Sequence, residues 1–305
     1  MTAWTLRDIP PQHGRTAIVT GTGGIGFEDA LALARAGADV IIAGRNEAKG
    51  REAVARIRAA ATRASVSFEA LDLADLASVA RFAARMQASR ERVDLLVNNA
   101  AVMALPQRRL SADGHEMQFA TNYLGHFALT ARLLPLLRAG RGARVISLSS
   151  VAARQGTIAF DNLQAERRYR PMTVYSQTKL ACLMFAFELQ RRSDAHGWGI
   201  TSIAAHPGIA RTELVANGAG MVSLFGAFRV LFSHVFFQSA AQGALPTLFA
   251  ATAPDAKPGG YYGPDRMNEI RGNPGVAVAP KKSLDTTVAA RLWEISAQLA
   301  QVRFA

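Results

Sequence analysis

The sequence predicts an α/β protein with a doubly wound parallel sheet and helices on both faces. Short β-branched runs alternate with helix-length segments over the first 200 or so residues, a pattern typical of parallel strands joined by crossover helices. The glycine-rich stretch TGTGGIG, residues 20–26, follows the first of these runs directly and precedes an Ala/Leu-rich segment. The chain has 305 residues, half of them hydrophobic, so it can bury a full core.

The elements follow in alternation along the chain. We expect strands at 16–19, 40–42, 66–68, 95–97, 145–148 and 200–204, and helices at 25–36, 46–60, 75–89, 112–138 and 173–195. Helix boundaries are predicted from capping residues, with Asn46, Asp75 and Ser111 as N-caps, Gly37 as a stop signal, and Pro171 and Thr173 opening the last helix. Together they predict a single Rossmann-like domain spanning 1–305.

An apolar segment interrupts this pattern after the last expected strand. Residues 214–237 lack sheet-like alternation and predict a lid or substrate loop at about 212–240. Within it Phe225, Phe228, Leu231 and Phe232 recur at helical spacing and are candidates for an apolar substrate pocket. Ordinary core packing and a helix lying on a membrane surface are the alternatives.

Composition excludes several classes of protein. The net charge is +12, but the arginines are scattered rather than gathered in a basic run, so we expect no nucleic-acid partner. No apolar stretch reaches the roughly 20 residues of a membrane span, and no leader pattern is visible, so we expect a cytoplasmic protein with at most peripheral membrane contact. The six histidines and the lone Cys182 lie far apart, which predicts no metal site.

The glycine-rich stretch has two interpretations. Gly21, Gly23 and Gly26 fit the dinucleotide pattern G-x-G-x-x-G, whereas residues 20–26 also fit a T-G-x-x-x-G-x-G loop that is one residue short. Both patterns place glycines where a pyrophosphate approaches the backbone N–H groups of a helix N-terminus.

Arg45 lies at the end of the second expected strand, in the stretch AGRN. A site for NAD(H) usually has Asp or Glu here to accept from the ribose hydroxyls, whereas a guanidinium can pair with a 2′-phosphate. The sequence therefore favours NADP(H), with NAD(H) as the alternative.

Tyr175 and Lys179 are four residues apart in VYSQTK, and therefore lie on one face of a helix. A lysine one turn away would lower the pKa of the tyrosine and fit it for proton transfer to a carbonyl oxygen. Ser150 ends a strand at the carboxyl edge of the sheet, where open α/β sheets bind ligands.

These motifs, with NNAA at 98–101, TNYLGHF at 121–127, SLSS at 147–150 and HPG at 206–208, resemble the short-chain dehydrogenase/reductase family from about residue 12 to 265. The resemblance implies a catalytic tetrad of Asn122, Ser150 (rather than Ser149), Tyr175 and Lys179. It also implies a cofactor site that includes Tyr175, Lys179, Gly21, Thr22, Gly23, Gly24, Ile25, Gly26, Arg45, Asp72, Leu73, Asn99, Ala100, Pro207, Gly208 and Thr212.

The long interval between Ser150 and Tyr175 and the late YYGP motif resemble the retinol-dehydrogenase-like branch and its bacterial relatives. That branch implies NADP(H) and small apolar alcohol, aldehyde or ketone substrates, with a homo-oligomer as an open option. Two alternatives remain: reduction of a C=C bond, as in protochlorophyllide-reductase relatives, and a nucleotide-binding sensor or scaffold without turnover.

Overall fold

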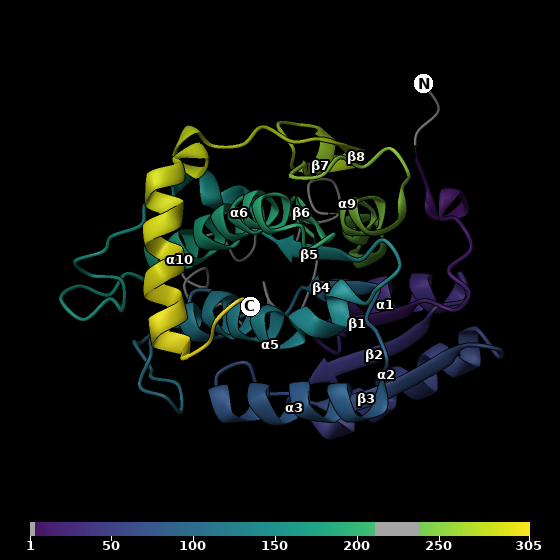
Figure 1. The fold of residues 1–305 in the computed structure, drawn as a ribbon. Coiled ribbons are helices and arrows are strands. Elements are labelled where there is room, and N and C mark those ends of the chain that lie inside the picture. Colours follow the sequence, from purple (N-terminus) through teal and green to yellow (C-terminus); the bar gives the residue numbers. More distant parts are fainter. Residues whose placement is uncertain (1–3, 211–237) are drawn as a thin grey trace.

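The computed structural model describes residues 4–210 and 238–305, and an eight-stranded sheet runs through its centre (Figure 1). The strand order is β3-β2-β1-β4-β5-β6-β7-β8, and every neighbouring pair is parallel except β7 and β8. The strands are β1 (Thr16–Thr20), β2 (Asp39–Gly44), β3 (Ser65–Ala70), β4 (Leu95–Asn98), β5 (Arg144–Leu148), β6 (Thr201–Ala205), β7 (Tyr261–Arg266) and β8 (Arg271–Val276). The order reverses between β1 and β4, so a crevice opens at the carboxyl ends of these two strands.

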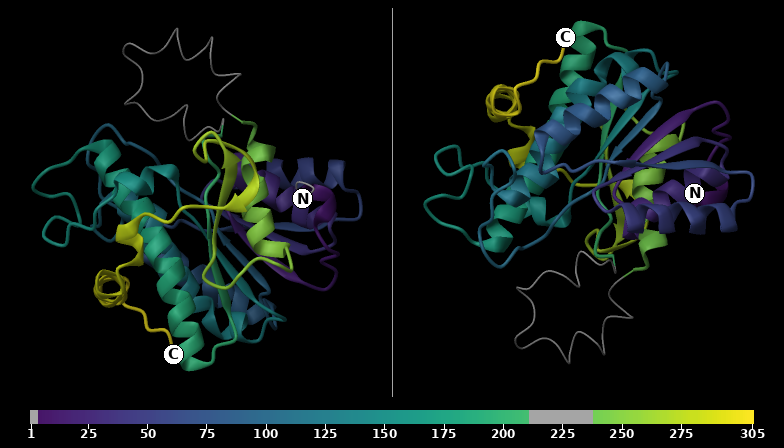
Figure 2. Two further views of the ribbon diagram at one scale, coloured as in Figure 1. Left: turned by 90° about the horizontal axis from the view of Figure 1, so that it is seen from above. Right: turned by 90° about the horizontal axis from the view of Figure 1, so that it is seen from below.

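Helices cover both faces of the sheet (Figure 2). One face carries α1 (Gly24–Arg35), α2 (Glu47–Ala60) and α9 (Ala240–Thr252), and the other carries α3 (Leu76–Ser89), α5 (Gly125–Arg138) and α6 (Pro171–His196). The last helix, α10 (Thr286–Ala300), crosses the outer side of α5 and α6 (Figure 1). The short helical segments are η1 (Leu6–Asp8), α4 (Met117–Phe119), η2 (Ala120–Leu124), η3 (Val151–Gln155) and η5 (Lys281–Leu284). The predicted α/β class and the doubly wound sheet are confirmed.

The central strands are apolar on both sides because both faces are covered. Ile18 and Leu96 pack into the layer beneath α3, α5 and α6, whereas Val19 and Val97, one residue further along, pack into the layer beneath α1 and α9. All four side chains are fully buried. This two-sided burial explains why the strands read as continuous β-branched runs rather than as alternating ones.

Six strands lie where the sequence predicts them, but β7 and β8 were not predicted. Gly263 and Pro264 interrupt β7, and β8 reads R-G-N-P-G-V, so neither strand has the β-branched run on which the other predictions depend. A bulge between Pro264 and Arg266 adds to the irregularity of this hairpin. The helices α9 and α10 were also missed.

The capping residues are confirmed in part. Asn46 and Asp75 cap α2 and α3 with side-chain hydrogen bonds, and Gly37 follows α1 with a left-handed φ of 97°. Ser111 is wrong as an N-cap, because its hydroxyl accepts from the N–H groups of Asp113 and His115 within a turn.

The helix predicted at 112–138 instead begins at Met117, where the Glu116 carboxylate accepts from the Phe119 N–H at 2.7 Å. It continues through η2, a π-helical turn, into α5. Among the described residues, no helix is both long and apolar enough to cross a membrane.

Candidate active site

The glycine-rich loop joins β1 to α1 at the crevice. Gly23 is the N-cap of α1 and makes no side-chain cap hydrogen bond, so the N–H groups of the first helical turn are left without a capping side chain. Gly21 and Gly24 have left-handed φ values of 101° and 54°. This geometry suits an anion at the helix N-terminus, and the pyrophosphate of a dinucleotide fits it.

The position of the Asn99 side chain explains why residues 21 and 26 are glycines. Its side-chain amide donates to the Thr20 carbonyl oxygen at 2.7 Å. A Cβ at Gly21 would lie 2.8 Å from this amide nitrogen, and one at Gly26 would lie 2.5 Å from it. The close approach of β4 to the loop therefore requires glycine at both positions.

Thr20 and His126 form a buried hydrogen-bonded contact beneath the loop, and the sequence did not predict this contact. The Thr20 hydroxyl accepts from the N–H groups of Asn99 and Ala100 at 2.9 and 3.0 Å, and lies 2.9 Å from His126 Nε2. The other ring nitrogen, Nδ1, lies 3.0 Å from the carbonyl oxygen of Asn122. Because a carbonyl can only accept, Nδ1 carries the hydrogen. Nε2 can therefore accept from the Thr20 hydroxyl, whose single hydrogen is shared with the Val97 carbonyl oxygen at 3.3 Å. The sequence feature that could have pointed to this contact is His126 itself, which lies in the motif TNYLGHF.

The residues predicted for the adenosine end lie past β2 and β3. Arg45 is exposed between β2 and the N-cap of α2, and no described residue pairs with its guanidinium. Asp72 accepts from the Ala74 N–H at 2.9 Å, so its carboxylate caps a turn. Leu73 is buried in the core beside Gly125.

Tyr175, Ser150 and Lys179 come together at the carboxyl ends of β5 and β6. Tyr175 lies in the second turn of α6, which Pro171 opens, and its hydroxyl lies near enough to the Ser150 side chain for Ser150 to favour the phenolate form. Lys179 lies one turn further along α6, with Nζ 5.9 Å from the Tyr175 ring centroid. Its ammonium donates to the Leu148 carbonyl oxygen at 2.9 Å. Both α6 side chains are buried.

The expected lowering of the Tyr175 pKa is absent from this structure. Burial raises the pKa of Tyr175 to about 12, and only the nearby Ser150 side chain acts in the opposite direction. Burial also lowers the pKa of Lys179, whose ammonium is directed to the end of β5 rather than to the phenol oxygen. A four-residue spacing places two side chains on one helix face, but it does not fix where their polar atoms point.

Asn122 lies within the π-helical turn η2, and both hydrogens of its side-chain amide are donated to other parts of the protein. The amide accepts from the Val102 N–H at 2.7 Å, donates to the Val102 carbonyl at 2.9 Å and donates to Thr178 Oγ1 at 3.0 Å. Cys182 donates to its backbone carbonyl at 3.1 Å. Asn122 therefore ties the loop after β4 to α6, on the side that holds Tyr175.

Ser149 and Ser150 have different partners. The Ser149 hydroxyl is buried, donates to the Lys179 carbonyl at 2.8 Å and lies near Tyr261 of β7. Ser150 is partly exposed and reaches Tyr175. This arrangement supports Ser150 as the residue that meets a ligand.

Pro207 and Gly208 follow β6 and border the same crevice, since β6 pairs with β5 up to Ala205. The other residues proposed for this side, Thr212, Phe225, Phe228 and Phe232, and most of the predicted lid at 212–240, lie outside the described residues. Within the described part of the chain, no group of His, Cys, Asp and Glu could hold a metal ion.

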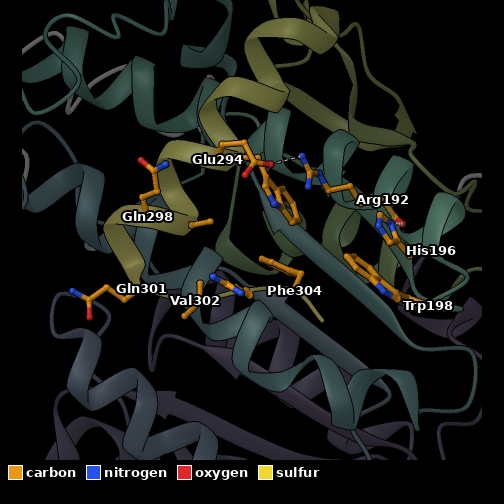
Figure 3. A pocket seen from close by; sticks show the side chains of 11 residues that line it. Arg192, His196, Trp198, Glu294, Gln298, Gln301, Val302 and Phe304 are labelled. Carbon is orange, nitrogen blue, oxygen red and sulfur yellow. Dashed lines mark hydrogen bonds and ion pairs between the residues drawn. The ribbon is translucent and has the colours of Figure 1, made fainter.

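A separate pocket of about 690 Å³ lies at the other end of α6, where α10 and the C-terminal residues pack (Figure 3). Arg192 is seventeen residues beyond Tyr175, which is about 25 Å along a helix. The pocket is lined by Arg192, His196, Trp198, Trp293, Glu294, Ala297, Gln298, Gln301, Val302, Arg303 and Phe304. None of the predicted site residues belongs to it.

The uncapped glycine loop at α1 and the Ser-Tyr-Lys cluster at the carboxyl edge of the sheet define a dinucleotide-dependent oxidoreductase. The family model of the short chain dehydrogenases matches residues 15–220. The chain belongs to this family, and it is therefore an enzyme that uses a nicotinamide cofactor on alcohol or carbonyl groups.

The alignments with curated relatives span most of the chain. It is 45% identical to polyprenol dehydrogenase of Mus musculus over 260 residues, which are 83% of this chain and 76% of the relative. It is 40% identical to retinol dehydrogenase 13 of Mus musculus over 297 residues, 96% of this chain and 85% of the relative.

Solved structures share the fold. A protein from Mycobacterium paratuberculosis is 37% identical, with a TM-score of 0.82 over the whole of both chains. Pseudomonas aeruginosa RhlG, solved as an NADP active-site complex, is 22% identical with a TM-score of 0.65, covering 90% of this chain and 99% of that chain. The second similarity concerns the fold alone.

Proposed function

We propose that this protein is an NADP(H)-dependent dehydrogenase/reductase that interconverts an alcohol and a carbonyl group on an extended, apolar substrate of the retinoid or polyprenoid kind. The proximity of Tyr175 to Ser150, with Lys179 buried one turn further along α6, carries the proposal. The identities of 45% and 40% to a polyprenol and a retinol dehydrogenase support the substrate class.

The chemistry divides between the cofactor and the protein. A bound nicotinamide supplies or accepts the hydride. Tyr175 donates a proton to the substrate oxygen during reduction and removes it during oxidation, and Ser150 hydrogen-bonds to the same oxygen and orients it.

Lys179 lies buried one turn further along α6, where its ammonium donates to the Leu148 carbonyl oxygen at the end of β5. We propose that its remaining N–H groups bind the ribose hydroxyls of the nicotinamide half of the cofactor. Asn122 keeps α6 and the loop after β4 in register, and we propose that it also positions a water molecule for proton exchange with solvent.

The preference for NADP(H) rests on Arg45. Its exposed guanidinium stands at the end of β2 with no described partner, so it is available to a 2′-phosphate. The ribose-binding carboxylate of an NAD(H) site is replaced here by Gly44 and Arg45.

The test is a turnover assay with purified protein. Retinol, retinal, a short polyprenol and its aldehyde are each offered with NADP(H) and with NAD(H), and products are identified by mass spectrometry. We expect alcohol–aldehyde interconversion with a higher kcat/KM for NADP(H). Saturation of a C=C bond would establish the other reaction, and nucleotide binding without any product would indicate a sensor or scaffold.

A further inference from the structure

Three segments that are distant in the sequence meet beside the end of β6, outside the predicted catalytic tetrad. They are η3, which directly follows Ser150, the loop that contains His206 and Gly208, and the turn between β7 and β8. Glu269 in that turn contacts both of the other segments.

The Glu269 carboxylate is shared between two partners. Its Oε2 lies 2.8 Å from Arg154 Nη2 and 2.9 Å from His206 Nε2, while Oε1 accepts from the Val278 N–H at 2.9 Å. Arg154 also donates through Nη1 to the Asn268 carbonyl oxygen at 3.2 Å. The carboxylate side chain is 13% exposed, and the His206 ring is fully buried. The Arg154 side chain is 31% exposed, so the ion pair between Arg154 and Glu269 is partly enclosed rather than fully solvated.

The contact to His206 fixes the backbone of the loop. The Gly208 N–H donates to His206 Nδ1 at 3.2 Å, so the hydrogen of the ring is on Nε2 and points to Glu269. Gly208 has a left-handed φ of 63°, and a Cβ there would collide with the Ile270 carbonyl. Glu269 therefore orients the ring that holds Gly208 in place.

Glu269, Arg154 and His206 form a cluster in which one negative charge is paired with one positive charge. Burial opposes ionisation of Glu269, but the hydrogen bonds from His206 and Val278 outweigh it and lower the pKa of the carboxyl. Burial lowers the pKa of His206, which leaves the ring neutral near pH 7. The ion pair is thus between Glu269 and Arg154, and His206 is a neutral donor.

The turn that carries Glu269 is strained. Met267, Asn268 and Glu269 have φ values of 50°, 53° and 66°, so three consecutive residues other than glycine adopt the left-handed conformation. The left-handed conformation is costly for residues other than glycine, and such runs persist only where surrounding contacts hold them. Two of these residues direct their oxygens at Arg154, which links the strain to this cluster.

We propose that Glu269 is a positioning residue for the reactive half of the cofactor cleft, holding the segment after Ser150 and the Pro207–Gly208 loop in fixed relation. The reactive half of the dinucleotide has to lie beside Tyr175 and Ser150, at the ends of β5 and β6, whereas the adenosine half extends towards β2. Loss of Glu269 should therefore weaken contacts to the nicotinamide end alone. This inference rests on the proposed NADP(H)-dependent function.

The experiment compares two ligands on the same variant. NADPH and 2′-phospho-ADP-ribose, which is the same molecule without nicotinamide, are titrated against wild type and Glu269→Gln by calorimetry. We expect the Kd for NADPH to rise about tenfold in the variant, and the Kd for the fragment to change less than about twofold. Arg154→Lys, which keeps the charge but loses the two-pronged contact, should show the same selective effect and provides the test if Glu269→Gln does not fold.

Glu188→Gln is the matched control. Glu188 is an enclosed carboxylate on α6 that pairs with Arg191 and Arg192, away from the crevice, and its loss should leave both Kd values unchanged. Equal weakening of NADPH and the fragment, or a lower melting temperature with both Kd values unchanged, would overturn the inference while leaving the proposed function intact. A wild-type protein that binds neither ligand would overturn both.

Discussion

Thr20 and His126 join the cofactor loop to the helix that carries Asn122, through a buried hydrogen bond of 2.9 Å between Thr20 Oγ1 and His126 Nε2. The ring is locked as the Nδ1–H tautomer by the Asn122 carbonyl, so Nε2 has to accept. Burial lowers the pKa of His126 to about 4. Protonation would place a hydrogen on Nε2, so the Thr20 hydroxyl could no longer donate to the ring and would keep only the Val97 carbonyl oxygen, 3.3 Å away, as an acceptor.

His126 should make folding sensitive to acid. In the unfolded chain it binds a proton near pH 6.5, but in the folded protein only near pH 4, so its stabilising contribution is present above pH 6.5 and is lost as the pH falls to 4. The difference corresponds to about 3 kcal/mol. His126→Asn, which can keep a donor near the Asn122 carbonyl, should lose less unfolding free energy across this range. Urea unfolding at pH 7 and pH 4.5 measures it, and equal pH dependence of the two proteins would contradict the prediction.

Asp29 should have the opposite effect on the pH dependence of stability, because it lowers the free energy of unfolding as the pH rises. Its carboxylate is fully buried on α1, neither oxygen has a partner among the described residues, and burial raises its pKa well above the ordinary value. Its stabilising contribution is therefore complete below pH 4 and is lost as the pH rises through the folded pKa. Asp29→Asn should gain at least about 1 kcal/mol of unfolding free energy at pH 8 and little at pH 4. Asp94→Asn is the control, because Asp94 is equally buried but accepts from Thr16 and Arg141, and its replacement should destabilise the protein.

Tyr175→Phe should lower kcat by roughly 100-fold or more and leave cofactor affinity nearly unchanged, because the proton-transferring hydroxyl is lost and the ring is kept. Tyr123→Phe removes a hydroxyl that is buried against Ser296 in the core, 2.8 Å away. This control should lower the melting temperature and retain turnover. A near-normal rate in Tyr175→Phe would remove this residue from the mechanism.

Arg45→Asp should shift the ratio of kcat/KM from NADP(H) towards NAD(H), since it introduces repulsion of the 2′-phosphate and an acceptor for the ribose hydroxyls. Arg51→Asp makes the same charge change one helical turn into α2, where Arg51 pairs with Glu47. If both variants change the ratio equally, the effect is one of net charge, and Arg45 does not bind the phosphate.

Local features of the chain could be predicted from sequence, and long-range contacts could not. The strands β1 to β6, the glycine loop and the Tyr175–Lys179 pair depend on residues within a few positions of one another. The contact from Thr20 to His126 joins residues 106 positions apart, and that from His206 to Glu269 spans 63. The direction of the Tyr175 pKa was missed for a related reason, because burial by other segments raises it and the Lys179 ammonium is directed to the Leu148 carbonyl oxygen instead.

The β7–β8 hairpin also limits how the sheet can associate. An unprotected edge strand offers a row of N–H and C=O groups to any other extended chain. Here the outermost strand carries Pro274, which has no N–H, between Gly272 and Gly275, and its pairing with β7 shifts register between Pro264 and Arg266. These features disfavour the addition of a ninth strand at this edge, so the hairpin protects the protein from growing into a continuous sheet with other copies of itself.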